Sequence, residues 1–516
     1  MTSPAVDRTR AALRQVRHAP ADLWRPVYEQ AMATAYEEGR VDDLADLALL
    51  AAGRLEAQGE YDGALAEVEF ASGMAGDVPD ASAYLMCAKA FYLALANKCA
   101  AAAQELERAR VLITHESSRQ ARLGLEVHSA IASCIALEDV EPARITSRVA
   151  SAEREGFPWL ATGLETSLVP WMFATGRRVE ARPWINALRV QASEQDHPWR
   201  QADADSFSYA DESARGSHHS GGLAGKAPAS GNDNRNARWR QTILNIHEAA
   251  VCGDLELAAG RVVTLAELRP MMSPGFADGA HTYKALIRAL GYVELIDHLD
   301  TPDDVTLLNL SAALAGAEAV AIAGSQAEAV RWRRWTERML PQHVTTALEW
   351  PASASRVLGL LSVRNGDVRR GVRLMRKAIH WAASAGYRLE CGIARVQLAE
   401  VLSLQREPAP ERTSSRLREA GRAQLTQLGV DPTLHAYAAN RALALGRQVE
   451  TSPRLTPREV EVLTLLADGV SYKQTAARLG IQWRTVQVHA HRIYAKLGVS
   501  GRVQAAKRAT ELQILG

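Results

Sequence analysis

The 516-residue sequence has few cysteines, few aromatic side chains, no long apolar run and a net charge of only +1. Its five cysteines are an odd number without a CxxC pair, so neither a disulfide framework nor a zinc cluster is expected. The nearest candidate for a membrane span, residues 310–324, is shorter than the roughly 20 residues that a bilayer requires and contains Glu318. Residues 1–20 lack the apolar segment of a secretory signal. These absences predict a soluble protein of the cytoplasm with reduced cysteines and no contact with a membrane.

What the sequence does contain is helix-forming and unevenly charged. Hydrophobic residues make up 47% of the chain but aromatic residues only 6%, because Ala, Leu and Val dominate, and this composition predicts an all-α fold. A chain of this length is expected to form two to four domains. Residues 452–516 hold ten Lys and Arg against four Asp and Glu, whereas residues 1–451 hold 50 against 55. A tail of net charge +6 on a body of −5 predicts a polyanion-binding module joined to an acidic body.

A short apolar pattern recurs through the first four-fifths of the chain. After Gly59 it places five apolar side chains on one stripe of a helix: Tyr61, Ala64, Leu65, Val68 and Ala71. The same register returns after Asn97, Glu138, Gly176, Gly253 and Gly366, with a weaker copy after Gly324. Most of these anchors lie about 40 residues apart, which is room for two helices and two turns, and two gaps are twice as long. Such helix pairs cannot bury their apolar faces alone, so they are expected to stack into a solenoid.

This pattern resembles the tetratricopeptide class of repeats, in the longer variant found in large bacterial regulators of the MalT type. The resemblance implies a tetratricopeptide-like α-solenoid over residues 1–446 that senses a molecule or binds a partner. The alternative is an irregular α-helical domain in which the regular spacing of alanines arises by chance.

Three segments are predicted to interrupt or end the helical body. Residues 201–238 contain only three large apolar side chains, and 11 of these 38 residues are Ser or Gly, which favours a disordered insertion or a lid. Residues 405–416 are predicted to be a hinge, and residues 447–453 a linker to the basic tail.

The tail has the local signals of a helix-turn-helix. Thr456 and Glu459 form a predicted capping box with Pro457 at the first helical position, and Ser471 and Gln474 form a second one. Gly480 is expected to end the second helix, and a longer basic helix begins near residue 482. Two short helices and a glycine turn before a basic helix are typical of a helix-turn-helix.

The basic helix is predicted to divide into two faces. Its core stripe is formed by Val486, His489 with Ala490, Ile493 and Leu497. The opposite face carries Arg484, Gln487, Val488 and His491, with Arg492 and Lys496 beside it. In a major groove, Gln can pair with adenine, Val can contact a thymine methyl, and cations can bind phosphates.

Residues 454–516 resemble the LuxR-type DNA-binding domain. The residues that match the family pattern are Leu455, Thr456, Arg458, Glu459, Glu461, Val462, Leu463, Gly469, Ser471, Lys473, Ala476, Leu479, Thr485, Val486, His489, Ile493, Lys496, Leu497, Val499, Arg502 and Ala505. The resemblance implies that Lys473, Thr485, Arg492 and Lys496 hold the DNA backbone while Gln487, Val488 and His491 face the bases. It also implies a dimerisation helix over residues 502–512, with Val503, Ala506 and Thr510 as contacts. Three residues depart from the family pattern. Tyr472 stands where Asn is usual, Gln482 where Ser or Asp is usual, and Gln487 where Lys is usual.

No catalytic, metal or cofactor motif is complete. The sequence that begins at His247 fails the HExxH pattern because Val251 stands at the second His position. Gly225 and Lys226 do not complete a phosphate loop, because Ser220 stands at the first Gly position and Ala227 replaces the Ser or Thr, so the NTPase domain of MalT-type regulators is not expected. His489 and His491 lie two positions apart on a helix and point in different directions, so they cannot share a metal. Trp483 is expected to pack against the first helix of the tail, with stacking on a DNA sugar as the alternative, and the tryptophans of the body are expected to fill gaps between helices.

The sequence therefore predicts a bacterial transcription regulator without enzymatic activity, cofactor or metal, associated with the nucleoid. Its tail would bind an inverted-repeat operator in double-stranded DNA as a homodimer, under control of an unidentified effector or protein partner on the helical body. Contact with RNA polymerase is implied by the family resemblance alone. The alternative is a tetratricopeptide-type scaffold for protein binding, with a tail that mainly dimerises.

Overall fold

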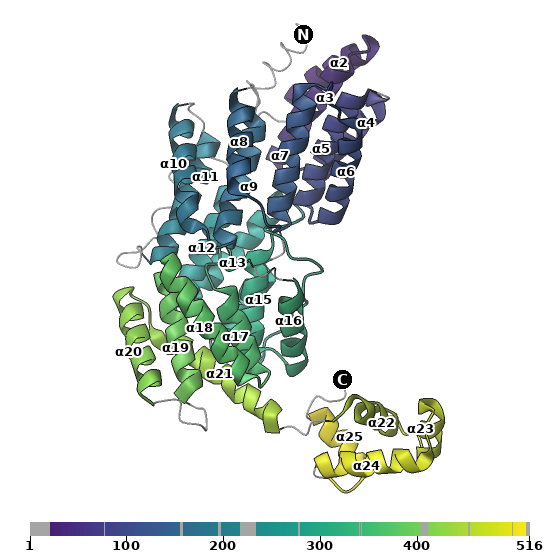
Figure 1. Cartoon of the computed structure of the whole chain (residues 1–516), viewed down its shortest axis with the longest axis vertical. Helices are drawn as coiled ribbons and strands as arrows, with labels where there is room; N and C mark the ends of the chain where they lie inside the picture. The colour runs from purple at the N-terminus through teal and green to yellow at the C-terminus, as the bar shows by residue number, and fades with distance from the viewer. Residues whose placement is uncertain are drawn as a thin grey trace.

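Helical hairpins stacked side by side form the body of the protein (Figure 1). The computed structural model describes residues 21–511 except 77, 155–157, 195–197, 217–233, 277–278, 340, 342, 404–410, 452–454 and 498. The first part of the body contains α2 (Ala21–Glu37), α3 (Val41–Gln58), α4 (Tyr61–Ala75), α5 (Pro79–Leu95), α6 (Cys99–Leu112), α7 (Arg119–Ile135), α8 (Pro142–Arg154), α9 (Pro158–Ala174), α10 (Arg178–Glu194) and α11 (Pro198–Arg215). The second part contains α12 (Arg235–Cys252), α13 (Leu255–Leu268), the 3-10 turn η2 (Arg269–Met271), α14 (Gly279–Leu290), α15 (Leu310–Ala323), α16 (Gln326–Met339), α17 (Ala354–Arg364), α18 (Val368–Ala385), α19 (Arg388–Ser403), α20 (Glu411–Gln427) and α21 (Pro432–Thr451). The described residues include no strand, so the all-α prediction is confirmed.

The repeat anchors lie at the turns between paired helices. Gly59, Gly176, Gly253 and Gly366 have positive φ angles of 78–88° and join α3 to α4, α9 to α10, α12 to α13 and α17 to α18. Asn97, with φ 60°, makes the corresponding turn between α5 and α6. Glycine adopts this left-handed conformation without steric cost, which explains why it recurs at this place in the pattern.

Successive helix pairs stack on one another. The first helices α3, α5, α7 and α9 pack one against the next, while α4, α6 and α8 pack on their own partner and on the following pair. The predicted stripe of α4 is buried at Ala64, Val68 and Ala71. Each hairpin therefore buries its apolar face against its neighbours, as the repeat pattern predicts.

Each of the two wide gaps contains one described α-helix that lies outside the anchored pairs, α11 in the first gap and α14 in the second. Gly216, with φ 70°, ends α11, and the next described helix is α12. The second gap contains α14, after which residues 291–309 run without regular structure to α15. The structure thus accounts for both double spacings within the described residues.

The prediction of a disordered insertion at 201–238 is wrong for the residues that the structure describes. Residues 201–215 belong to α11, residues 235–238 begin α12, and residues 217–233 lie outside the described part. The side chain of Phe207 is fully buried, and Asp203 and Asp211 are buried in ion pairs with Arg240 and Arg178. The sequence signal failed because this helix is held by alanines and paired charges, which a count of large apolar side chains does not register.

The predictions of a hinge at 405–416 and a linker at 447–453 are also wrong for the residues that the structure describes. Residues 411–416 of the hinge form the start of α20, and residues 404–410 lie outside the described part. Residues 447–451 of the linker continue α21, which ends at Thr451. The helix therefore extends to within five residues of the first helix of the tail, which begins at Pro457.

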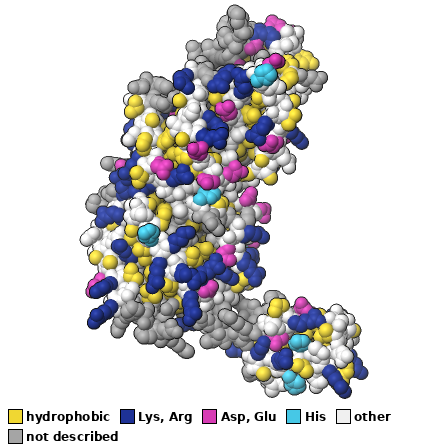
Figure 2. All heavy atoms as spheres, viewed as in Figure 1, with side chains coloured by type: hydrophobic (Ala, Val, Ile, Leu, Met, Phe, Trp, Pro, Cys, Tyr) yellow, Lys and Arg dark blue, Asp and Glu magenta, His cyan; other side chains and the backbone are white. Residues whose placement is uncertain are grey.

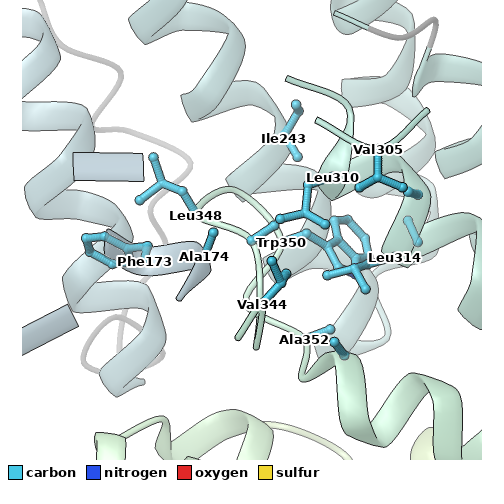
Figure 3. Packing of buried hydrophobic residues seen from close by; sticks show 14 of the residues in the cluster. Phe173, Ala174, Ile243, Val305, Leu310, Leu314, Val344, Leu348, Trp350 and Ala352 are labelled. Atoms are coloured by element: carbon cyan, nitrogen blue, oxygen red, sulfur yellow. The ribbon is translucent and has the colours of Figure 1, made fainter. Parts of the chain in front are cut away.

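The later hairpins fold back against the middle of the body. Arg178 at the start of α10 donates to the carbonyl of Ala385 at 3.1 Å, and Thr345 N–H donates to the carbonyl of Ala174 at 2.7 Å. Trp350 is 2% exposed and lies 4.7 Å from His247 and 5.1 Å from Tyr283 between ring centroids. Figure 3 shows it packed among apolar side chains of α15 and the segment before α17, so the core role predicted for this tryptophan is confirmed. None of the described helices has the length and apolar character that a membrane crossing would need.

A buried arginine joins three first helices of the later hairpins. Arg356 on α17 donates from Nη1 to Glu318 of α15 at 2.5 Å and from Nε to Glu390 of α19 at 2.7 Å. Its side chain is 2% exposed, and a further bond at 3.2 Å reaches Gln397. The ion triad fixes the relative positions of α15, α17 and α19.

Replacing Arg356 by Met is expected to destabilise the body by about 3–5 kcal/mol, because it leaves two carboxylates buried without a counter-charge. Urea unfolding of the full chain measures the change. Arg376→Met, at an exposed position on α18, is the matched control and should stay within about 0.5 kcal/mol of the wild type. Equal midpoints for the two variants would contradict the structural role of the triad.

Candidate nucleic-acid interface

The tail forms four helices around a core of its own. These are α22 (Pro457–Ala467), α23 (Tyr472–Leu479), α24 (Trp483–Leu497) and α25 (Arg502–Glu511), which gather as a separate group in Figure 1. The buried core residues are Val462, Leu463, Leu466, Ala476, Val486, Ala490, Ile493, Tyr494, Leu497, Ala505 and Ala509. Since every member of this cluster comes from the tail, the four helices bury their apolar faces on one another.

Both predicted capping boxes are confirmed. The N–H of Glu459 donates to Thr456 Oγ1 at 3.2 Å, and the Thr456 N–H donates back to Glu459 Oε2 at 2.7 Å. Ser471 and Gln474 form the second box at the start of α23. Gly480, with φ 63°, ends α23 in the left-handed conformation and turns the chain toward α24.

The two faces of α24 separate as the sequence predicts. Val486, Ala490 and Ile493 are fully buried and Leu497 is 6% exposed, while His489 is half-buried. The expected DNA-facing residues are all exposed: Lys473 on α23 and Arg484, Thr485, Gln487, Val488, His491, Arg492 and Lys496 on α24. Val488 is 49% exposed in the middle of this polar face, where it has no role in the core. We call these eight residues the α24 face.

Lys496 differs from the other cations of the α24 face because it is already paired. Its Nζ donates to Glu459 Oε2 at 2.5 Å, and the Glu459 side chain is only 4% exposed. Burial acts to raise the pKa of Glu459, but the bonds from Lys496 and Thr456 outweigh it and hold that pKa below its usual value. Lys496 therefore links α24 to the capping box of α22, a role that the sequence did not reveal.

Tyr472 has a structural reason to replace the family's usual Asn. Its hydroxyl lies 3.2 Å from the hydroxyl of Tyr494 on α24, which joins the first residue of α23 to the basic helix. Burial and this hydrogen bond raise the pKa of Tyr494. The pair holds the two helices of the helix-turn-helix together.

Trp483 does not pack as expected. It is 46% exposed at the start of α24, and the guanidinium of Arg484 lies 5.7 Å from its ring centroid. The prediction that Trp483 packs against the first helix is therefore wrong. Its position as the first residue of the helix leaves the ring beside the α24 face.

The residues predicted for dimerisation lie on the free side of α25. Val503 is 82% exposed, Thr510 is exposed and donates to the carbonyl of Ala506 at 3.1 Å, and Ala506 is half-buried. Ala505 and Ala509 on the other side are fully buried. The three residues are accessible to a partner, and their role in dimerisation stays a prediction. Among the described residues, no cluster of three or more His, Cys, Asp or Glu side chains could hold a metal ion.

Replacing Lys496 by Met is expected to destabilise the tail by about 1 kcal/mol at neutral pH, because Glu459 loses its counter-charge in a partly exposed pair. A carboxyl with a lowered folded-state pKa stabilises the fold above its ordinary pKa, and this contribution is lost as the pH falls through the lower folded value. The difference in the free energy of unfolding between the wild type and the variant should therefore decrease in acid. Urea unfolding of residues 455–516 across pH measures it.

Lys473→Met is the matched control, since Lys473 is exposed and pairs with no other described residue. This variant should have the same free energy of unfolding as the wild type at neutral pH, and the same change of that free energy in acid. A Lys496→Met variant with the same acid dependence as the wild type would contradict the importance of the pair.

Comparisons with known proteins agree with this geometry. The family described as "Bacterial regulatory proteins, luxR family" matches residues 453–509. The transcriptional regulatory protein UhpA of Escherichia coli is 46% identical over 66 residues, which cover 13% of this chain and 32% of UhpA. The HTH-type transcriptional regulator MalT of Serratia proteamaculans is 41% identical over 64 residues, 12% of this chain and 7% of MalT.

A longer similarity reaches into the body. A putative HTH-type transcriptional regulator of Mycobacterium bovis is 29% identical over 244 residues, which cover 40% of this chain and 26% of the relative. The chain thus spans about a quarter of that relative's length, and an alignment of this extent must include helices of the body. No solved structure matches the chain. Residues 453–509 form a helix-turn-helix domain of the LuxR family of bacterial regulatory proteins.

Proposed function

We propose that this protein is a transcriptional regulator that binds double-stranded DNA through α24. The observation that carries the proposal is the composition of the α24 face. Cations, a glutamine, a threonine, a histidine and one exposed valine lie opposite a fully apolar buried stripe. A face of this kind fits the major groove, which accepts an α-helix and presents donors, acceptors and methyl groups to it.

The residues of the face divide between phosphates and bases. Lys473, Arg492 and Thr485 hold the DNA backbone, which fixes the position of the helix without reading sequence. Gln487 reads adenine and Val488 contacts a thymine methyl, with His491 one turn further along the same face. Arg484 binds phosphate near the start of the helix. Lys496 contributes less to binding than the other cations, because part of its charge is neutralised by Glu459.

Two tails bind together as a homodimer through Val503, Ala506 and Thr510 of α25. Two copies related by a twofold axis would read an inverted repeat with half-sites one or more helical turns apart. The exposed Val503 supports this, because a large apolar side chain that is 82% exposed gains free energy when a partner covers it.

The helical body acts as the sensor for an effector or protein partner, and the regulator works in the cytoplasm on the nucleoid without catalysing a reaction. The comparisons support this arrangement because the similarity to a mycobacterial HTH-type regulator continues beyond the tail. A signal on the body would then change how the tails pair, since linked binding sites gain affinity from their effective concentration. RNA polymerase is the partner expected of an activator of this kind.

Replacing Gln487 by Ala is expected to weaken discrimination of one base pair in each half-site by about 1–3 kcal/mol, because a bidentate contact to adenine is lost. Genomic fragments selected with the full-length wild type supply the site, and binding to single-base variants of that site measures the change. Gln427→Ala, at an exposed glutamine of α20, is the matched control and should keep the wild-type preference. A full-length protein that selects no sequence at low salt would contradict the proposal and favour a protein-binding scaffold.

A further inference from the structure

The body itself carries a strongly basic region that the helix-turn-helix does not explain. Residues 1–325 contain 30 Lys and Arg against 44 Asp and Glu, a net charge of −14. Residues 326–427 contain 18 against 9, a net charge of +9. The body is acidic on average, but it contains a positively charged region that begins at α16.

Much of the positive charge lies on two outer helices, α16 and α18. α18 contains five Arg and Lys residues and no Asp or Glu, and an ion pair of 3.0 Å between Arg370 and Glu337 joins its start to the end of α16. Six exposed cations on these helices form what we call the basic face: Arg334, Arg338, Arg369, Arg373, Arg376 and Lys377. Figure 2 shows Lys and Arg side chains gathered over this part of the body.

The cations of the basic face lack partners within the described part of the chain. None of the six side chains forms an ion pair or hydrogen bond with another described residue. Arg369, Arg373 and Lys377 follow one another at intervals of four on α18, and like charges at this spacing destabilise a helix. An external polyanion would relieve this repulsion.

The chemistry of the face fits phosphate better than a protein surface. Five of its six cations are arginines, whose guanidinium group binds phosphate through two parallel hydrogen bonds. None of the exposed large hydrophobic side chains of the described residues lies on α16 or α18. Protein interfaces depend on buried aromatic or aliphatic anchors, whereas the backbone of DNA is bound mainly by cations.

The short connection between α21 and the tail would hold bound DNA near the basic face. A Cβ atom at Gly446 would lie 2.1 Å from the carbonyl oxygen of Val363, so α21 passes directly against the end of α17. The turn after α17 leads into α18 at Val368, one residue before Arg369. From the end of α21 at Thr451, five residues lead to α22, and they span at most about 20 Å. DNA held by the tail is therefore tethered close to the basic face, at a high effective concentration.

We propose that the basic face of α16 and α18 binds the phosphate backbone of the DNA that flanks the operator, as a second, sequence-independent contact. This inference rests on the proposed function of the tail, which delivers the DNA. The face would lengthen the contacted DNA and increase the salt dependence of binding without changing which bases are read.

The test compares full-length protein in which Arg369, Arg373 and Arg376 are all replaced by Gln with a matched control in which Lys98, Arg144 and Lys284 are replaced by Gln. The control positions are exposed, pair with no other described side chain and lie in the acidic part of the body. The probes are the selected site as a duplex of about 20 base pairs, enough for two half-sites one helical turn apart, and the same site centred in a duplex about three times as long.

On the long duplex, the basic-face variant should reduce the slope of log affinity against log salt by about 2 to 3, since each lost phosphate contact removes about 0.9. On the short duplex, and for the control variant on both duplexes, the slope should match the wild type. Equal slopes for the two variants on the long duplex would overturn the inference.

Two further outcomes separate the alternatives. If the basic-face variant loses self-association at low salt but keeps wild-type DNA binding, the face pairs with the acidic part of a second copy and the inference is wrong. If the wild type selects no site, the proposed function of the tail fails instead. Salt slopes on a long duplex of random sequence would then still decide the role of the basic face, since only a phosphate-binding face makes its variant differ from the control.

Discussion

The burial of one stripe of α24 determines what the tail can do. Val486, Ala490 and Ile493 are removed from water against α22, and this apolar contact fixes the rotation of the helix about its axis. Gln487, Val488 and His491 must then point outward, whatever they bind. The ion pair between Lys496 and Glu459 and the contact between Tyr472 and Tyr494 hold the same orientation. The face presented to DNA is thus a consequence of packing inside the domain.

The body follows a related rule on a larger scale. Each hairpin has an apolar side that only the next hairpin can cover, so the chain extends as a stack until its later hairpins fold back on the middle. Charged groups are buried in this stack as ion pairs at several places, as at Arg356 with Glu318 and Glu390. The six cations of the basic face differ from these buried charges because they are exposed and have no partner among the described residues.

Much of this architecture could be predicted from the sequence, because it depends on local patterns. The glycine turns, both capping boxes and the buried stripe of α24 follow from residue types at fixed spacing. The helix over 201–215 could not be recognised, since Asp203 and Asp211 become favourable inside it only through arginines on other helices. The pairing of Lys496, the exposure of Trp483 and the passage of α21 against the end of α17 likewise depend on the three-dimensional arrangement of the helices.

The central claim is that the exposed side of α24 is the surface that contacts DNA. Amide chemical-shift mapping by NMR of residues 455–516 during titration with a duplex that contains one half-site of the selected site, and so binds a single tail, tests it most directly. The account predicts that the largest shifts fall at Arg484, Gln487, Val488 and His491, with small shifts on α25 and on the buried stripe. Shifts concentrated on α25, or no shifts at saturating duplex, would contradict it.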